Sequence, residues 1–339
     1  MMRKVFLLLI SLAIGIGLFV WIAEAVGWQS IKDAILVFTG WQGLVILGLT
    51  ILMALIGTWK WREILKGGGN NISFVSLLNP YLAGFSIMFL APVLLWGGEV
   101  FRSYILKERN NIPWSKGMAS VIIDRMLEWT ANLSVIFFGG FFFLFIIGFP
   151  PLKLGIIFGG LFLILLLGAS LFYFKCVKKE SFVSLFIKNS QNKPFEIEKE
   201  IFGFFKVKKA AMWKALFLSF LRAGTMYVRA WFLILFLGKT ISALPVLSIL
   251  GFSYLAVMIP IPTALGSHEA IQTFAFNALG LGASTATAFT MIIRGAELIF
   301  SLAGIMILFR LGVILIKNIL FKKIDKLVEN NESGHQSSH

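Results

Sequence analysis

Long hydrophobic runs, separated by short polar segments, repeat along almost the whole chain. An α-helix needs about 20 apolar residues to cross the hydrocarbon core of a bilayer, and most of these runs approach or exceed that length. The alternation of period two that is typical of a transmembrane β-barrel is missing. The pattern therefore predicts an all-α, polytopic membrane helix bundle, with spans at 5–23, 43–59, 78–95, 117–147, 152–174, 213–237, 244–260 and 284–316.

Two short segments, 97–108 and 265–280, are half polar and fit no full span. Each begins with small residues just after an apolar run that contains a proline, Pro92 in one case and Pro262 in the other. This pattern is typical of a chain that reverses direction inside the membrane. We predict two re-entrant half-helix hairpins, which are stable only where protein or a wet cavity satisfies their backbone.

Composition and motifs narrow the class further. Hydrophobic residues make up 58% of the 339 residues, charged ones make up 14%, and the mean hydropathy is +0.88. In soluble domains about a quarter of the residues are charged. Cys176 is the only cysteine, and the sequence has no Walker motif, no Gly-x-Ser-x-Gly and no His-x-x-x-His pair. We therefore expect no catalytic residues, no metal site and no cofactor.

The net charge of +15 comes from Lys and Arg residues in the loops between the apolar runs. We interpret them as anchors beside anionic lipid rather than as a nucleic-acid site. The positive-inside rule places both termini in the cytoplasm of a multi-pass cell-membrane protein, with six full crossings and two hairpins that enter from opposite faces. The cytoplasmic loops hold Arg3, Lys4, Lys60, Arg62, Lys66, Arg102, Lys107, Arg109, Lys116, the Lys-rich stretch 175–214, Lys317, Lys322, Lys323 and Lys326, and the outer loops hold Lys32, Lys153 and Lys239.

We predict a single integral membrane domain over residues 1–326. Its Lys-rich cytoplasmic loop, 175–212, alternates basic and apolar residues, a pattern that is typical of an amphipathic helix at the membrane surface. The polar residues 327–339 are expected to form a disordered cytoplasmic tail.

The two halves of the chain carry the same short pattern of proline and charged residues. Proline precedes glutamate by 7 residues in both halves, glutamate precedes arginine by 26 and 25, and arginine precedes a second glutamate by 3. Because the charge map makes the two hairpins open from opposite sides, we infer inverted repeats over about 43–147 and 213–316, an architecture of transporters. Accidental matching in a low-complexity apolar chain is the alternative. The residues are Pro92, Glu99, Arg125 and Glu128, then Pro262, Glu269, Arg294 and Glu297.

Charged residues inside the predicted spans cost about 2.5 to 3.5 kcal/mol each on insertion scales, so they normally face a polar interior. Arginine offers planar, bidentate donors to phosphate. We assign binding of a lipid phosphate to Arg102, Arg125, Arg222, Arg229 and Arg294. We assign orientation or proton coupling to Glu99, Asp124, Glu128, His268, Glu269 and Glu297. A lattice of structural ion pairs, with His268 as a hydrogen-bonding spacer, is the alternative.

Three motifs carry a resemblance to a known family. They are Gly97-Gly98-Glu99-Val100-Phe101-Arg102, Asp124-Arg125-Met126-Leu127-Glu128, and Pro260-Ile261-Pro262 leading to Gly266-Ser267-His268-Glu269-Ala270. Together they resemble the flippase-like family, also called the lysylphosphatidylglycerol synthase transmembrane-region family, of UPF0104-type proteins related to dolichol-phosphate-glucose synthetase. The resemblance extends over roughly residues 5–316.

This resemblance implies translocation of a lipid. In two-part bacterial members the membrane region flips aminoacylated phosphatidylglycerol, and a separate cytoplasmic domain makes that lipid from aminoacyl-tRNA. No such domain follows Lys326 in the sequence, so we expect no synthase activity. Thr263-Ala264-Leu265-Gly266 and His268 depart from the residues usual in relatives, which suggests a different substrate.

The expected function is a flippase, not an enzyme, that moves an anionic phospholipid or a polyprenyl-phosphate-linked glycolipid between leaflets. Its partners would be membrane lipids and a headgroup substrate, with no nucleic acid, and a lipid-synthesising enzyme is a candidate protein partner. Two other functions stay open. Asp124 and Glu128 could act as a base or hold Mg²⁺ in a membrane-embedded lipid-modifying transferase. The inverted repeat would also suit an ion-coupled transporter of small solutes.

Overall fold

The computed structural model of the chain describes residues 40–90, 97–148, 193–258 and 267–336, together with 159, 160, 163, 167 and 170. Within these residues the secondary structure is helical and contains no strand, which confirms the predicted all-α class. The predicted span 5–23 lies outside the described residues, and 152–174 is described at only five positions.

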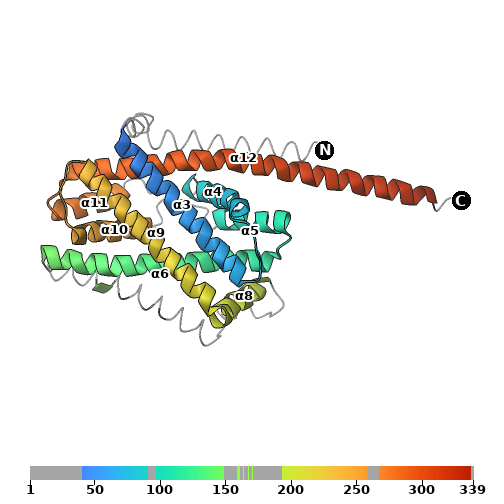
Figure 1. Cartoon of the computed structure of the whole chain (residues 1–339), viewed down its shortest axis with the longest axis horizontal. Coiled ribbons are helices and arrows are strands. Elements are labelled where there is room, and N and C mark those ends of the chain that lie inside the picture. Colours follow the sequence, from blue (N-terminus) through green and yellow to red (C-terminus); the bar gives the residue numbers. More distant parts are fainter. Residues whose placement is uncertain are drawn as a thin grey trace.

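Two sets of four helices follow one another along the chain, and both have the order long, short, short, long (Figure 1). The long helices of the two sets are apolar enough and long enough to cross a membrane, with α12 counted only from Ala283 to Leu311. The first set comprises α3 (Trp41–Gly67), α4 (Phe74–Leu90), α5 (Gly97–Asn110) and α6 (Trp114–Ile147). After α8 (Lys193–Val207), the second set comprises α9 (Lys209–Phe236), α10 (Ala243–Met258), α11 (Ser267–Ala278) and α12 (Ala283–Gln336).

The short helices pack in pairs, α4 with α5 and α10 with α11. At 1.5 Å per residue they measure about 18 to 26 Å, less than the hydrocarbon thickness of about 30 Å. Gly84 and Gly98 bring the backbones of α4 and α5 into direct contact, and a side chain at Gly98 would overlap the Gly84 carbonyl. In the second pair, Gln272 Nε2 donates a hydrogen bond to Ser253 Oγ at 2.6 Å. Both pairs match the predicted half-helix hairpins, although Pro92 and Pro262 lie outside the described residues.

The two sets pack against each other through equivalent helices. Helices α3 and α9 run antiparallel: the rings of Trp41 and Phe236 meet at one end, with centroids 5.0 Å apart, and Lys214 Nζ lies 3.0 Å from Glu63 Oε2 at the other (Figure 1). The last helix of each set packs on the second helix of the other set, α6 on α10 and α12 on α4. These directions and exchanged contacts are those that an inverted repeat requires.

Small residues lie at both exchanged contacts. Gly139 of α6 faces the backbone of α10, where a side chain at this position would meet the Leu247 carbonyl. Gly304 of α12 leaves room for Ser86 of α4, whose hydroxyl donates to the Ser301 carbonyl at 2.8 Å. Close packing at small residues is a common way in which membrane helices associate, because lipid offers no hydrophobic drive for it.

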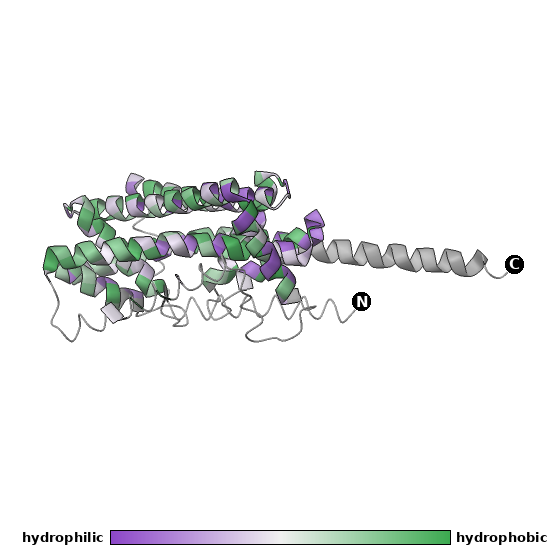
Figure 2. Cartoon of the chain, turned by 90° about the horizontal axis from the view of Figure 1, so that it is seen from below, coloured by the Kyte–Doolittle hydropathy of each residue, from purple (hydrophilic) through white to green (hydrophobic). Residues whose placement is uncertain are grey.

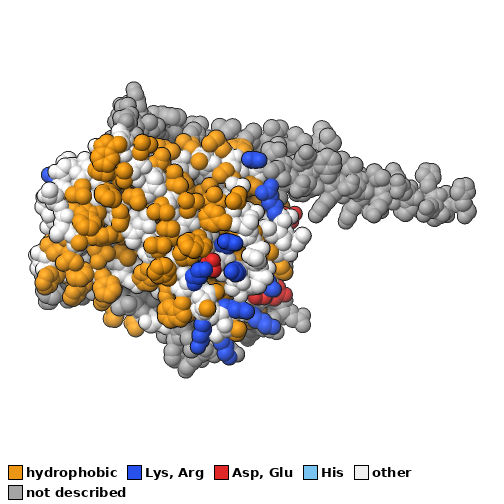
Figure 3. All heavy atoms as spheres, viewed as in Figure 1, with side chains coloured by type: hydrophobic (Ala, Val, Ile, Leu, Met, Phe, Trp, Pro, Cys, Tyr) orange, Lys and Arg blue, Asp and Glu red, His pale blue; other side chains and the backbone are white. Residues whose placement is uncertain are grey.

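The predicted surface helix exists as α8, and it is docked onto one end of the bundle. Ile201 and Phe204 are buried there in one cluster with Ile64 of α3 and Ala119 of α6. Figure 2 shows hydrophilic residues concentrated toward one end of the bundle, and Figure 3 shows Lys and Arg side chains gathered near α8 beside a mainly hydrophobic face. The bundle therefore has a basic end and an apolar body.

Two predicted boundaries differ from the structure. The span predicted as 43–59 continues as α3 to Gly67, because Trp61, Ile64 and Leu65 extend its buried face beyond the first charged residues. Helix α12 continues to Gln336 and so includes most of residues 327–339, which were predicted to form a disordered tail.

Candidate functional site

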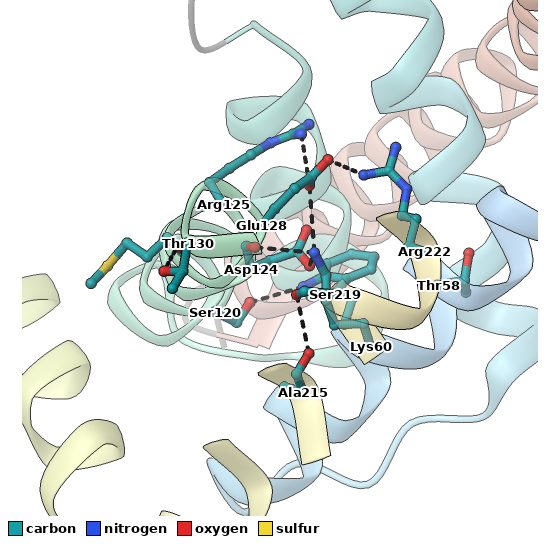
Figure 4. Close-up of polar contacts among 12 residues, drawn as sticks. Thr58, Lys60, Ser120, Asp124, Arg125, Glu128, Thr130, Ala215, Ser219 and Arg222 are labelled. Atoms are coloured by element: carbon teal, nitrogen blue, oxygen red, sulfur yellow. Dashed lines mark hydrogen bonds and ion pairs between the residues drawn. The ribbon is translucent and has the colours of Figure 1, made fainter. Parts of the chain in front are cut away.

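Seven charged side chains meet where α3, α5, α6 and α9 come together, and we call them the ion-pair network. Figure 4 shows members of this network from α3, α6 and α9 directed toward one another. Five of the seven lie on helices of membrane length, and the other two lie on the short helix α5, which packs against α6, so their charges are balanced mainly by one another. The network consists of Lys60, Glu99, Arg102, Asp124, Arg125, Glu128 and Arg222.

A fully buried layer forms the base of the network. Asp124 lies between two cations, with Oδ1 3.0 Å from Lys60 Nζ and Oδ2 3.0 Å from Arg102 Nη1, and none of the three side chains is more than 2% exposed. The Arg102 guanidinium also lies 4.0 Å from the ring centroid of Trp61 and 4.8 Å from that of Tyr81. Such stacking partly replaces the water that a buried guanidinium loses.

A second, partly exposed layer lies on this base and centres on Glu128. Its Oε1 accepts a hydrogen bond from Arg222, and its Oε2 lies 3.2 Å from Arg125 Nη1 and 3.4 Å from Lys60 Nζ (Figure 4). The side chains of Arg125, Arg222 and Glu128 are 23%, 17% and 13% exposed. Arg125 also donates through Nε to Glu99 Oε1 at 2.6 Å, so it bridges two carboxylates.

Local sequence explains why these groups converge. Arg125 and Glu128 are one helical turn apart on α6, so their side chains meet. Gly98 allows α5 to approach α4 closely, and Gly117 lets α6 approach α5 at Ser103. These contacts hold the turn of α5 that carries Glu99 and Arg102 against α6.

A second charged pair occupies the equivalent place in the other set of helices. Arg229 of α9 contacts Glu297 of α12, with Nη2 3.2 Å from Oε1, and its Nη1 donates to Thr50 Oγ1 at 3.1 Å. The separation from Arg229 to Glu297 is 68 residues, the same as from Lys60 to Glu128. In both sets, therefore, a cation on the first helix reaches a glutamate on the last.

The structure brings together most of the predicted site residues in these two places. Glu99, Arg102, Asp124, Arg125, Glu128 and Arg222 lie in the ion-pair network, and Arg229 and Glu297 form the second pair. Arg294 lies one turn before Glu297 on α12 and is half-buried; it and His268 each interact with a neighbour in the structure. The side chain of Glu269 lies outside the described part of the chain.

Lys60 is the member of the network that sequence reasoning missed. We expected it in a cytoplasmic loop, but α3 continues past it and buries it completely. Two signals could have found it: the apolar residues Trp61, Ile64 and Leu65 follow it at helical spacing, and its 68-residue separation from Glu128 repeats that of the second pair. A charged residue that is assigned to a loop can therefore belong to the preceding helix when apolar residues follow it at helical spacing.

The two layers give the three assigned arginines of the network different surroundings. Arg102 is buried beneath aromatic rings and paired with Asp124, so it supports the network from inside. Arg125 and Arg222 keep part of their surface accessible, and Arg222 Nε has no hydrogen-bond partner. Only these two arginines of the network can be reached by a group from outside without rearrangement of the base.

The carboxylates of the network are held by cations rather than arranged as a metal site. Each oxygen of Asp124 and of Glu128 lies beside a Lys or Arg nitrogen. Across the described residues, no group of three or more His, Cys, Asp or Glu side chains is placed to hold a metal ion. The carboxylate oxygens of Asp124 and Glu128 thus have Lys and Arg side chains as their partners.

Comparison with known proteins places this architecture in a family. The model of the lysylphosphatidylglycerol synthase TM region matches residues 8–304. The chain belongs to that family. The match includes every member of the ion-pair network and the Arg229–Glu297 pair, and it confirms the resemblance inferred from the motifs. Family membership and the four long apolar helices together make the chain a multi-pass membrane protein.

Members of the family in archaea are similar to the chain over most of its length. A UPF0104 membrane protein of Methanocaldococcus jannaschii is 26% identical over 273 residues, which cover 73% of this chain and 77% of the relative. A UPF0104 membrane protein of Pyrococcus horikoshii is 29% identical over 273 residues, which cover 73% of this chain and 81% of the relative. No solved structure matches the chain.

Proposed function

We propose that this protein is a lipid flippase, which moves an anionic phospholipid or a polyprenyl-phosphate-linked glycolipid between leaflets. The observation that carries the proposal is the convergence of Arg125 and Arg222, from two membrane-length helices, on one partly exposed point. At 1.5 Å per residue Arg125 lies about 16 Å from the start of α6, and Arg222 about 20 Å from the start of α9. Both therefore lie several turns inside helices that are long enough to cross a membrane, and we infer that a headgroup passes them.

The family and the packing support this proposal. The name of the family refers to the membrane region of a lipid synthase, and a flippase needs no catalytic group of its own. Inverted sets of helices with broken segments between them are an architecture in which a site is exposed alternately to each side. We place the protein in the cell membrane with both termini in the cytoplasm, and a lipid-synthesising enzyme is its proposed partner.

Reconstitution into vesicles tests the proposal. The purified protein should move fluorescent phosphatidylglycerol from the inner to the outer leaflet, measured as loss of protection from a membrane-impermeant quencher. Arg125→Ala should reduce the rate at least about tenfold, which corresponds to about 1.4 kcal/mol. Arg109→Ala removes an exposed arginine at the end of α5 and should leave the rate unchanged.

The same vesicles separate the proposal from its rivals. A wild-type protein that is folded yet moves no lipid would overturn it. A new lipid product would instead indicate a transferase, and uptake of an aqueous solute would indicate a solute carrier. Equal rates for Arg125→Ala and Arg109→Ala would show that the network does not bind the headgroup.

A further inference from the structure

Glu128 is surrounded as a bound anion would be. Guanidinium groups from α6 and α9 contact different oxygens of its carboxylate, and the Lys60 ammonium lies behind it. We propose that the carboxylate of Glu128 occupies the place that the substrate's phosphate takes between Arg125 and Arg222, and that this site selects lipids whose phosphate is a phosphodiester, with one negative charge. This inference rests on the proposed function and specifies its substrate class.

The stereochemistry of the two anions supports the exchange. A carboxylate has two oxygens that share one negative charge, and a phosphodiester has two non-bridging oxygens that do the same. Arginine binds either group through paired N–H donors. A phosphodiester lipid can therefore accept hydrogen bonds from Arg125 and Arg222 in place of Glu128, while its tails stay in the bilayer.

Lys60 provides a cationic partner for the Glu128 carboxylate after the phosphate has displaced it. It already lies 3.4 Å from Glu128 Oε2, is buried, and is fixed at 3.0 Å from Asp124. When the arginines turn to the substrate, Glu128 keeps a cationic partner and is not left as an unpaired charge inside the membrane. An unpaired charge of that kind would cost several kcal/mol and would oppose binding.

The charge balance of the network sets the charge of the preferred phosphate group. The network has four cations, Lys60, Arg102, Arg125 and Arg222, and three carboxylates, Glu99, Asp124 and Glu128, so its net charge is 4 − 3 = +1. One phosphodiester charge neutralises it. A phosphomonoester carries about −1.5 to −2 and leaves an excess.

Two lipids test this selectivity in vesicles that contain the full-length protein. Fluorescent phosphatidylglycerol is a phosphodiester, and fluorescent phosphatidic acid is a phosphomonoester. We expect phosphatidylglycerol to move at least about tenfold faster than phosphatidic acid, a factor equal to about 1.4 kcal/mol. Glu128→Gln raises the network charge to +2, so the ratio of the phosphatidic acid rate to the phosphatidylglycerol rate should rise about tenfold.

Glu63→Gln is the matched control, because Glu63 also lies on a membrane helix but pairs with Lys214 outside the network. It should leave the ratio unchanged. Equal rates for the two lipids, or faster movement of phosphatidic acid, would overturn the charge selectivity while the flippase function stands. An unchanged ratio in folded Glu128→Gln would overturn the role of Glu128. Failure of the wild type to move any lipid would overturn the proposed function and this inference together.

Discussion

Lys60 shows how one buried ammonium can hold two helices together. Its Nζ lies 3.0 Å from Asp124 Oδ1 and 3.4 Å from Glu128 Oε2, so α3 is tied to α6 at two successive turns. Lys60→Met should lower the free energy of unfolding by about 3 kcal/mol, because two carboxylates lose a buried partner. Unfolding in denaturant in detergent micelles measures this change.

Lys66→Met is the control for that variant. Lys66 is exposed near the end of the same helix, and surface substitutions of this kind change stability by about 0.5 kcal/mol or less. Similar losses of stability in the two variants would show that the contacts of Lys60 with Asp124 and Glu128 do not stabilise the fold.

Candidate site residues were predictable where charged residues interrupt a long apolar run. Asp124, Arg125 and Glu128 were found because no soluble-protein explanation suits charges in such a run. Their partners across helices were not predictable, since the pairing of Glu128 with Arg222 depends on how α6 and α9 pack. Lys60 was assigned to a loop for a different reason, because the charged residues that follow it hid the continuation of α3.

Helix α6 contains two adjacent glycines, and substitutions at them distinguish the effect of helix packing on stability from the effect of helix propensity. A side chain at Gly139 would meet the Leu247 carbonyl of α10, whereas one at Gly140 would meet nothing within 4 Å. Both substitutions improve helix propensity equally, so a difference between them reports the contact of α6 with α10. Gly139→Val should cost about 1 to 3 kcal/mol by overpacking, and Gly140→Val should be neutral or stabilising.

Thermal unfolding of the two glycine variants, followed by circular dichroism, measures this difference. A lower melting temperature for Gly139→Val alone is the expected result. Equal melting temperatures would mean that α6 and α10 are less closely packed than the structure places them.

The existence and approximate limits of the helices followed from hydropathy, and the two hairpins from proline and small residues beside half-polar segments. What hydropathy could not supply was a difference between the two sets. Arg102 and Asp124 form a buried pair in α5 and α6. At the same offset from the hairpin glutamate, 272 − 269 = 102 − 99 = 3, the second set carries Gln272 and no charge. The buried Arg102–Asp124 pair of the first set therefore has an uncharged residue at the position equivalent to Arg102 in the second set.

At the scale of the whole molecule, four matched residues in each half indicated an inverted relation. The structure adds the antiparallel contact of α3 with α9 and the exchanged contacts of α6 with α10 and of α12 with α4. These contacts join segments more than 100 residues apart, and a single sequence carries no signal for such pairing. The division into repeats over 43–147 and 213–316 thus gains a packing arrangement that the sequence pattern could not provide.

The bundle has two chemically different ends, and this difference predicts its orientation. Lys116, Glu200 and Gly68 line one small hollow, which brings together the start of α6, the helix α8 and the end of α3. This end is basic, with Arg62, Lys66, Lys116, Lys199, Lys206, Lys208, Lys209 and Lys214 on these helices and on the start of α9. At the opposite end, where Trp41 meets Phe236, Lys239 is the basic residue in the described loop 237–242.

Because basic loops stay in the cytoplasm, we expect the α8 end to face the cytoplasm and Lys239 to face the outside. Single cysteines at Lys239 and at Lys206, each in a Cys176→Ser background, test this with a membrane-impermeant maleimide applied to intact cells. Position 239 should label in intact cells, and position 206 only after the membrane is permeabilised. Both positions are exposed in the structure, so lack of labelling cannot be attributed to burial in the bundle. Labelling at 206 but not at 239 would show that the topology is the inverse of the predicted one. The site between Arg125 and Arg222 would then lie nearer the outer leaflet than we expect.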